Sequence, residues 1–136
     1  MHQEDDMIGV LVVHKEEGTR KLIRDMIIVR GDEYEVVMTE NAGRALEAIY
    51  DDQSISLAIV DFQAIWPDCG VFAEGAKMFR RNVVIALAVD DPDEGGDRVD
   101  IKFKMMDLPA RLDEFLAMAK SAAEPPPIVP KGLLDC

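Results

Sequence analysis

The feature that most constrains the fold is a series of short apolar runs, rich in β-branched residues, separated by longer amphipathic segments. The first run spans Ile8 to Val13, and charged residues follow it at once. The third spans Ser56 to Val60 and ends in the same way, on Asp61. Runs of this kind are typical of strands buried on both faces, which favours a parallel sheet covered by helices.

The segments between the runs have helical periodicity. From 18 to 30, apolar Leu22, Ile23, Met26 and Ile27 recur at helical spacing, and Asn41 can cap the next helix. Alternating strands and helices imply right-handed crossovers, so we predict a doubly wound α/β fold with a five-stranded parallel sheet. The expected strands are 8–13, 34–38, 56–60, 82–89 and 99–103, and the expected helices are 18–30, 41–50, 71–81 and 109–123.

The chain divides into one domain and two tails. A length of 136 residues with 49% hydrophobic content suits a single buried core, which we place at 7–123. Residues 1–6 are expected to form an N-terminal tail. Residues 124–136 place four prolines within EPPPIVP and are interpreted as a Pro-rich C-terminal tail or linker.

Charge and cysteine usage exclude several functions. A formal charge of −12 argues against direct binding to nucleic acid or to anionic membranes, because both attract basic surfaces. The two cysteines, Cys69 and Cys136, support neither a disulfide framework nor a Cys-rich zinc site. The N-terminus lacks the positive charge of a secretory signal and no apolar run could span a bilayer, so a cytoplasmic location is expected.

Three stretches resemble successive units of the receiver domain of bacterial response regulators, the CheY-like domain. They are VLVVHKEEGTRKLIRDM, EYEVVMTENAGRALEAI and LAIVDF, and the resemblance covers about Met7 to Ala123. It implies a flavodoxin-like sheet with strand order 2-1-3-4-5. Ala88 and Lys104 lie only 16 positions apart, and DDPDEGGD fills half of that interval. We therefore expect the family's fourth helix to be shortened or missing.

The resemblance also assigns site positions. Asp61 takes the position of the aspartate that accepts a phosphoryl group, and Lys104 that of the lysine that contacts the acyl phosphate. The family's Mg²⁺-binding acid pair is replaced by His14 and Lys15. The hydroxyl residue and the aromatic residue of the family's switch are replaced, respectively, by Ala88 and Ile101.

These replacements disfavour Mg²⁺, which prefers oxygen ligands. An ammonium about 4 Å from a cation costs on the order of 4 kcal/mol per unit-charge pair at an effective dielectric constant of 20. We expect Lys15 and Lys104 to pair with the Asp61 carboxylate instead, which gives a site with no metal and no cofactor. In the alternative, a loop rearrangement turns Glu16 or Glu17 toward Asp61 to hold Mg²⁺.

The sequence thus predicts an atypical receiver, or pseudo-receiver, that is not an enzyme and signals through protein–protein contact without an obligatory aspartyl-phosphate cycle. Its partner would be a histidine kinase, another receiver or an effector domain. The alternative is a functional phosphoacceptor, modified at Asp61 by a histidine kinase with Mg²⁺. Receivers often dimerise through the fourth helix, the fifth strand and the fifth helix, and the shortened segment leaves a homodimer with another interface and a monomer equally open.

Overall fold

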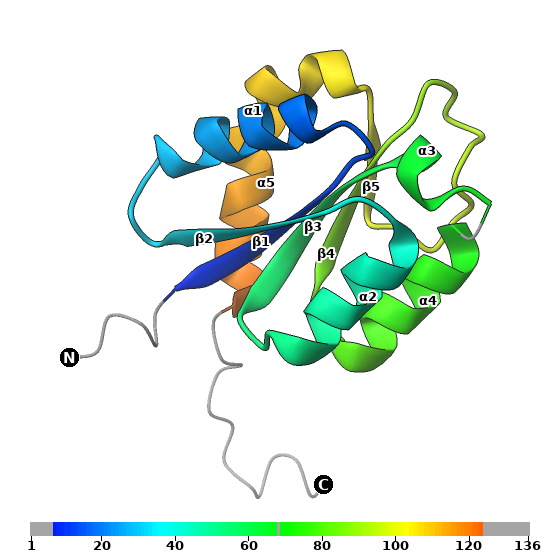
Figure 1. Ribbon diagram of the computed structural model, residues 1–136, viewed down its shortest axis with the longest axis horizontal. Helices are drawn as coiled ribbons and strands as arrows, with labels where there is room; N and C mark the ends of the chain where they lie inside the picture. Colours follow the sequence, from blue (N-terminus) through cyan, green and yellow to red (C-terminus); the bar gives the residue numbers. More distant parts are fainter. Residues whose placement is uncertain (1–6, 68, 124–136) are drawn as a thin grey trace, which may run out of the picture.

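The computed structural model describes residues 7–67 and 69–123, so the tails expected at 1–6 and 124–136 lie outside the described residues. Strands and helices alternate along the chain (Figure 1). A 3₁₀ turn, Met105–Asp107, precedes the last helix. The elements are β1 (Ile8–Val13), α1 (Glu17–Ile28), β2 (Tyr34–Thr39), α2 (Ala42–Asp51), β3 (Ile55–Asp61), α3 (Phe62–Ile65), α4 (Cys69–Phe79), β4 (Val84–Ala88), β5 (Ile101–Phe103) and α5 (Leu108–Ala123).

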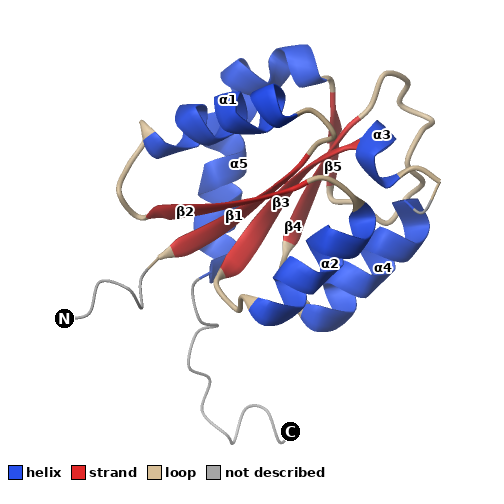
Figure 2. Cartoon of the chain, in the orientation of Figure 1, coloured by secondary structure: helices blue, strands red, loops and turns tan. Residues whose placement is uncertain are grey.

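The strands form one parallel sheet in the order β2-β1-β3-β4-β5, which confirms the predicted fold class. Helices α1 and α5 cover one face of the sheet, and α2 and α4 cover the other (Figure 2). The central strands β1 and β3 therefore lie between two helical layers. No helix within 7–67 or 69–123 is long and apolar enough to cross a bilayer.

The buried side chains form two clusters, one on each face of the sheet. Alternate residues of β1 point to opposite faces, so Val10 and Val12 pack toward α1 and α5 while Leu11 and Val13 pack toward α2 and α4. All four side chains are buried. Burial on both faces explains why this strand is a continuous apolar run rather than an alternating one.

The predicted helix boundaries agree with the structure to within a few residues. Asn41 caps α2 as expected, because its side chain accepts a hydrogen bond of 2.9 Å from the backbone N–H of Arg44. Two short elements were missed, namely α3 and the 3₁₀ turn. Both are about one turn long, too short to produce a periodic apolar pattern.

The family's fourth helix is missing, as predicted from the short interval between β4 and β5. Residues 89–100 contain turns and bends but no helix. This loop packs on the sheet through Gly95, whose φ is +88° and whose carbonyl accepts a hydrogen bond from the Cys69 thiol. At its end, the Asp100 carboxylate accepts hydrogen bonds from the Ile85 backbone N–H and from Lys77. The loop thus closes the part of the sheet that a helix would otherwise cover.

Candidate functional site

The candidate site lies at the carboxyl end of the sheet, where β1, β3 and β4 end side by side. The backbone register pairs Asp61, the last residue of β3, with Ala88, the last residue of β4. Val13 pairs with Val60 in the neighbouring strands, so His14 follows β1 next to Asp61. The topology therefore brings Asp61, Ala88 and His14 together, as ligand sites in open parallel sheets require.

A cavity of about 30 Å³ opens beside Asp61. Asp90 and Glu94, two acidic residues of the loop after β4, line this cavity together with Asp61. Glu94 is held in place because its carboxylate accepts hydrogen bonds from the backbone N–H groups of Asp90 and Asp91, at 3.0 and 3.2 Å. The cavity is lined by Asp61, Phe62, Gln63, Ala88, Val89, Asp90, Glu94 and Met105.

The surroundings of Asp61 disfavour its charged form. Burial raises the pKa of this carboxyl above 3.8, and the nearby carboxylates Asp90 and Glu16 raise it further. The His14 ring and the Gln63 backbone amide act in the opposite direction, but the net change in the pKa of Asp61 is upward. The protein groups around Asp61 therefore favour its neutral form.

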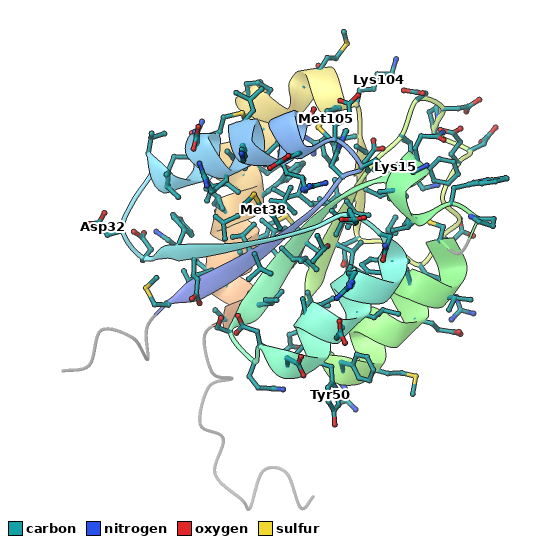
Figure 3. The ribbon with its side chains drawn as sticks, in the orientation of Figure 1. Lys15, Asp32, Met38, Tyr50, Lys104 and Met105 are labelled. Carbon is teal, nitrogen blue, oxygen red and sulfur yellow. The ribbon has the colours of Figure 1, made fainter. Side chains whose placement is uncertain are left out.

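The expected pairing of Asp61 with the two lysines is wrong. Among the described residues, no ion pair joins Asp61 to Lys15 or Lys104, and both lysines are exposed. Figure 3 shows Lys104 projecting outward at the rim of the molecule. The neighbouring Met105, and not Lys104, lines the cavity beside Asp61. The 3₁₀ turn that begins at Met105 follows Lys104 directly, and this local geometry separates the lysine from the carboxylate.

The loop after β1 is fixed by its own hydrogen bonds. Arg20 of α1 donates to the backbone carbonyls of His14 and Lys15, at 2.6 and 3.1 Å. The Glu16 backbone N–H donates to His14 Nδ1 at 3.0 Å, which fixes the imidazole ring at the end of β1. This network positions His14 near Asp61 and leaves the Lys15 side chain in solvent.

The substitute metal ligands are engaged elsewhere. Glu16 accepts a hydrogen bond of 3.0 Å from the Thr19 hydroxyl, and Glu17 pairs with Lys21 one turn further along α1. In the part of the chain that the structure describes, no three His, Cys, Asp or Glu side chains come together as a metal-binding group. His14 and Lys15 do not fit Mg²⁺ either, because neither offers an oxygen ligand.

The two replaced switch positions have different surroundings. Ala88 is buried and lines the cavity, but its methyl group has no hydroxyl to bind a phosphoryl oxygen. Ile101 is partly buried against the core layer of α1 and α5. Its aliphatic side chain packs against the core and has no aromatic ring to act as a switch residue.

Asp90, Glu94 and Met105 were missed as site residues from the sequence. From composition alone, the acidic stretch that holds Asp90 and Glu94 would be taken for a solvated loop, because a run of like charges usually is one. A signal was nevertheless present. The stretch begins directly after a buried strand, and loops at the carboxyl ends of parallel strands surround the site.

Solved structures with the same architecture identify the fold. A CheY-like receiver domain protein from Methanospirillum hungatei JF-1 superposes with a TM-score of 0.71 at 17% identity, over 86% of this chain and 96% of that one. The chain has the fold of a receiver domain. A "pilus assembly-related protein" from Burkholderia pseudomallei K96243 gives 0.70 at 16% identity, over 92% and 96% of the two chains.

A pseudo-receiver domain is also among the similar structures. The pseudo-receiver domain of the CikA protein superposes on this receiver fold with a TM-score of 0.60 at 12% identity, over 87% of this chain and 98% of that one. No protein-family model matches the sequence. No curated protein matches it either. The similarity to known proteins therefore lies in the fold, and function must be argued from the site.

Proposed function

We propose that this chain is an atypical receiver that acts in signal transduction through protein–protein contact, without an obligatory aspartyl-phosphate cycle and without a cofactor. The observation that carries the proposal is the charge around Asp61. Two carboxylates line its cavity, while the lysine that the family places there is exposed at the rim. We place this function in the cytoplasm, with a histidine kinase, another receiver or an effector domain as the partner.

A phosphoryl group on Asp61 would be poorly stabilised. It would carry a charge of about −1.5 to −2 and lie in a cavity that already holds Asp90 and Glu94. Phosphoryl transfer depends on cations that neutralise the charge developing on the transferred oxygens. Here only His14 and the Gln63 backbone amide lower the pKa of Asp61, and burial outweighs their effect.

The replaced switch positions support the same function. Ala88 has no hydroxyl to bind a phosphoryl oxygen, and Ile101 is an aliphatic residue packed against the core. The loop at 89–100 is anchored to β4 and α4 by Asp100 and Cys69 in place of a helix. We propose that the partner recognises this fixed surface directly, so that binding does not wait for a chemical change at Asp61.

The proposal is tested by titrating the ¹⁵N-labelled protein with millimolar Mg²⁺ and recording its backbone amide chemical shifts. We expect no saturable shift at Asp61, Gln63 or Ala88. The matched variant His14→Asp/Lys15→Asp, which restores the acid pair, should show such shifts at the same concentrations. Saturable shifts around Asp61 in the unmodified protein would contradict the proposal, because they would show that the site assembles metal ligands after all.

A further inference from the structure

Strand β2 forms one edge of the sheet, and the backbone along its outer side is unpaired (Figure 1). Within the described residues, β2 pairs with β1 alone. At the end of β2, the Thr39 carbonyl accepts a hydrogen bond of 3.1 Å from the His14 amide on the β1 side. Because backbone groups alternate in direction along a strand, the N–H and C=O groups of Tyr34, Val36 and Met38 point away from the sheet.

The edge of β2 lacks the features that usually prevent an edge strand from pairing further. Such strands are commonly protected by proline, by lysine or by a β-bulge. The sequence of β2, YEVVMT, contains neither proline nor lysine, and its register against β1 is continuous. Val36, Val37 and Met38 pack against the two core clusters but are only partly buried. An added strand would cover these side chains and hydrogen-bond the free backbone groups.

A surface pocket of about 460 Å³ lies beside this edge, between the end of β2 and α2. Alternate side chains of β2 face opposite layers, so Val37 and Thr39 face the layer of α2 and α4. The Thr39 hydroxyl oxygen is buried and has no hydrogen-bond partner among the described residues. Such an oxygen is costly to leave unpaired, and a chain bound here could supply its partner. The pocket is lined by Met38, Thr39, Glu40, Asn41, Arg44, Glu47, Ala48 and Asp51.

The charge of this pocket is negative. Three exposed carboxylates, Glu40, Glu47 and Asp51, line it together with one cation, Arg44. Arg44 pairs with Glu47 at 3.7 Å, and no ion pair within 7–67 or 69–123 includes Glu40 or Asp51. A lysine or arginine side chain is therefore the complementary one. A second copy of this chain is disfavoured as the occupant, because each copy has a formal charge of −12.

We propose that an extended segment of a partner protein pairs with the outer edge of β2 and adds a strand to the sheet. Its side chains face the two layers in alternation. On the side of α2 and α4, lysine or arginine meets Glu47 and Asp51, and on the side of α1, apolar residues cover Val36 and Met38. This contact uses no group of the Asp61 cavity. Its failure would leave the Mg²⁺ result unchanged, so it is distinguishable from failure of the proposed function.

The pairing is tested by hydrogen exchange of the backbone amides in the ¹⁵N-labelled full chain. The probe is a synthetic eight-residue peptide, blocked at both ends, in which valine and lysine alternate. In the free protein, we expect fast exchange at Val36 and Met38 and slow exchange at Val37 and Thr39, whose amides face β1. With peptide at about ten times its Kd, exchange at Val36 and Met38 should slow about tenfold, because roughly a tenth of the molecules are then free. Unchanged exchange at both residues in millimolar peptide would overturn the proposal.

The charge requirement is tested with two double variants. Glu47→Lys/Asp51→Lys should weaken binding of the valine–lysine peptide by about tenfold or more, because two attractive pairs become repulsive. Asp93→Lys/Asp97→Lys is the matched control, because it changes the formal charge equally at two exposed residues of the loop between β4 and β5, toward the other edge of the sheet. It should change the affinity by no more than about twofold, since salt screens distant charges. Circular dichroism checks that each variant is folded.

A second peptide, with glutamate in place of lysine, tests the sign of the partner's charge. It should not bind the unmodified protein. Equal binding of the two peptides would contradict a basic partner, and so would an equal loss of affinity in the two double variants.

N-methylated peptides test the backbone pairing. A peptide strand pairs with β2 through one edge, so N-methyl groups on the valines or on the lysines block that edge in only one of two peptides. One methylated peptide should bind and the other should not. If both bind equally well, side chains alone are recognised and no strand is added. Protection of Val36 and Met38 that increases with protein concentration, without peptide, would also overturn the proposal, because a second copy would then occupy the edge.

Discussion

The packing of the loop at 89–100, which takes the place of the fourth helix, leads to a prediction about substitutions at Gly95. A Cβ atom at this position would lie 2.2 Å from Leu87 Cδ2, a contact that real structures do not tolerate. Leu87 is 0% exposed, so its side chain can move away only by repacking the buried residues around it. Gly95 also has a φ of +88°, which a residue with a Cβ adopts only with strain. Gly95→Ala therefore incurs two separate costs.

A substitution at the neighbouring Gly96 separates the cost of the positive φ from the cost of the close contact. Its φ is +71°, but a Cβ there would meet nothing within 4 Å. Positive φ costs an alanine about 1–2 kcal/mol, and overpacking a closed core costs about 1–3 kcal/mol. We expect Gly96→Ala to lower the free energy of unfolding by about 1–2 kcal/mol and Gly95→Ala by about 2–5 kcal/mol. The change in unfolded-chain entropy is common to both and cancels in their difference.

The two variants are compared by urea unfolding followed by far-ultraviolet circular dichroism. Trp66 is the only tryptophan but is 63% exposed, so its fluorescence would be a poor reporter of the core. Equal losses of stability in the two variants would refute the reasoning. They would show that Gly95 does not pack on Leu87 and that the loop at 89–100 does not close this part of the sheet.

Two further predictions concern the cap of α2 and the site. Asn41→Ala should lower the free energy of unfolding by about 1 kcal/mol, because the Arg44 N–H loses its side-chain acceptor, and Asn41→Asp should preserve it in the same urea experiment. The raised pKa of Asp61 means that its ionised form costs stability. The free energy of unfolding of Asp61→Asn should therefore increase relative to that of the unmodified protein as the pH rises from below 3.8 through the folded-state pKa of Asp61. A difference between the two proteins that does not change with pH would contradict this prediction.

Much of the fold could be predicted from the sequence because the buried strands are continuous apolar runs. The first run was assigned its observed bounds, since a charged loop ends it at once. The fifth strand was predicted at 99–103 but is only Ile101–Phe103. Its first two predicted residues belong to the loop, where the Asp100 carboxylate is held by Lys77 and by the Ile85 backbone. Local pattern cannot show such a long-range contact.

The site residues at the strand ends could be predicted from the sequence, but those in the loops could not. Asp61 and Ala88 follow from the topology, because the carboxyl ends of parallel strands meet at one edge. The direction of Lys104 does not follow from topology, because the turn beginning at Met105 sets it. The composition of the acidic loop at 89–100 likewise does not show where its side chains lie. Its hydrogen bonds place Glu94 beside Asp61 although both side chains are acidic.

The central claim is that Asp61 does not need to be phosphorylated and is poorly placed for it. The most direct test is intact-mass spectrometry after incubation with acetyl phosphate and excess Mg²⁺, with Asp61→Asn treated in parallel and an active receiver domain in the same reaction as a positive control. We predict that the mass of this chain stays unchanged while that of the active receiver increases. A phosphoryl adduct that forms on the unmodified chain and is lost in Asp61→Asn would contradict the account.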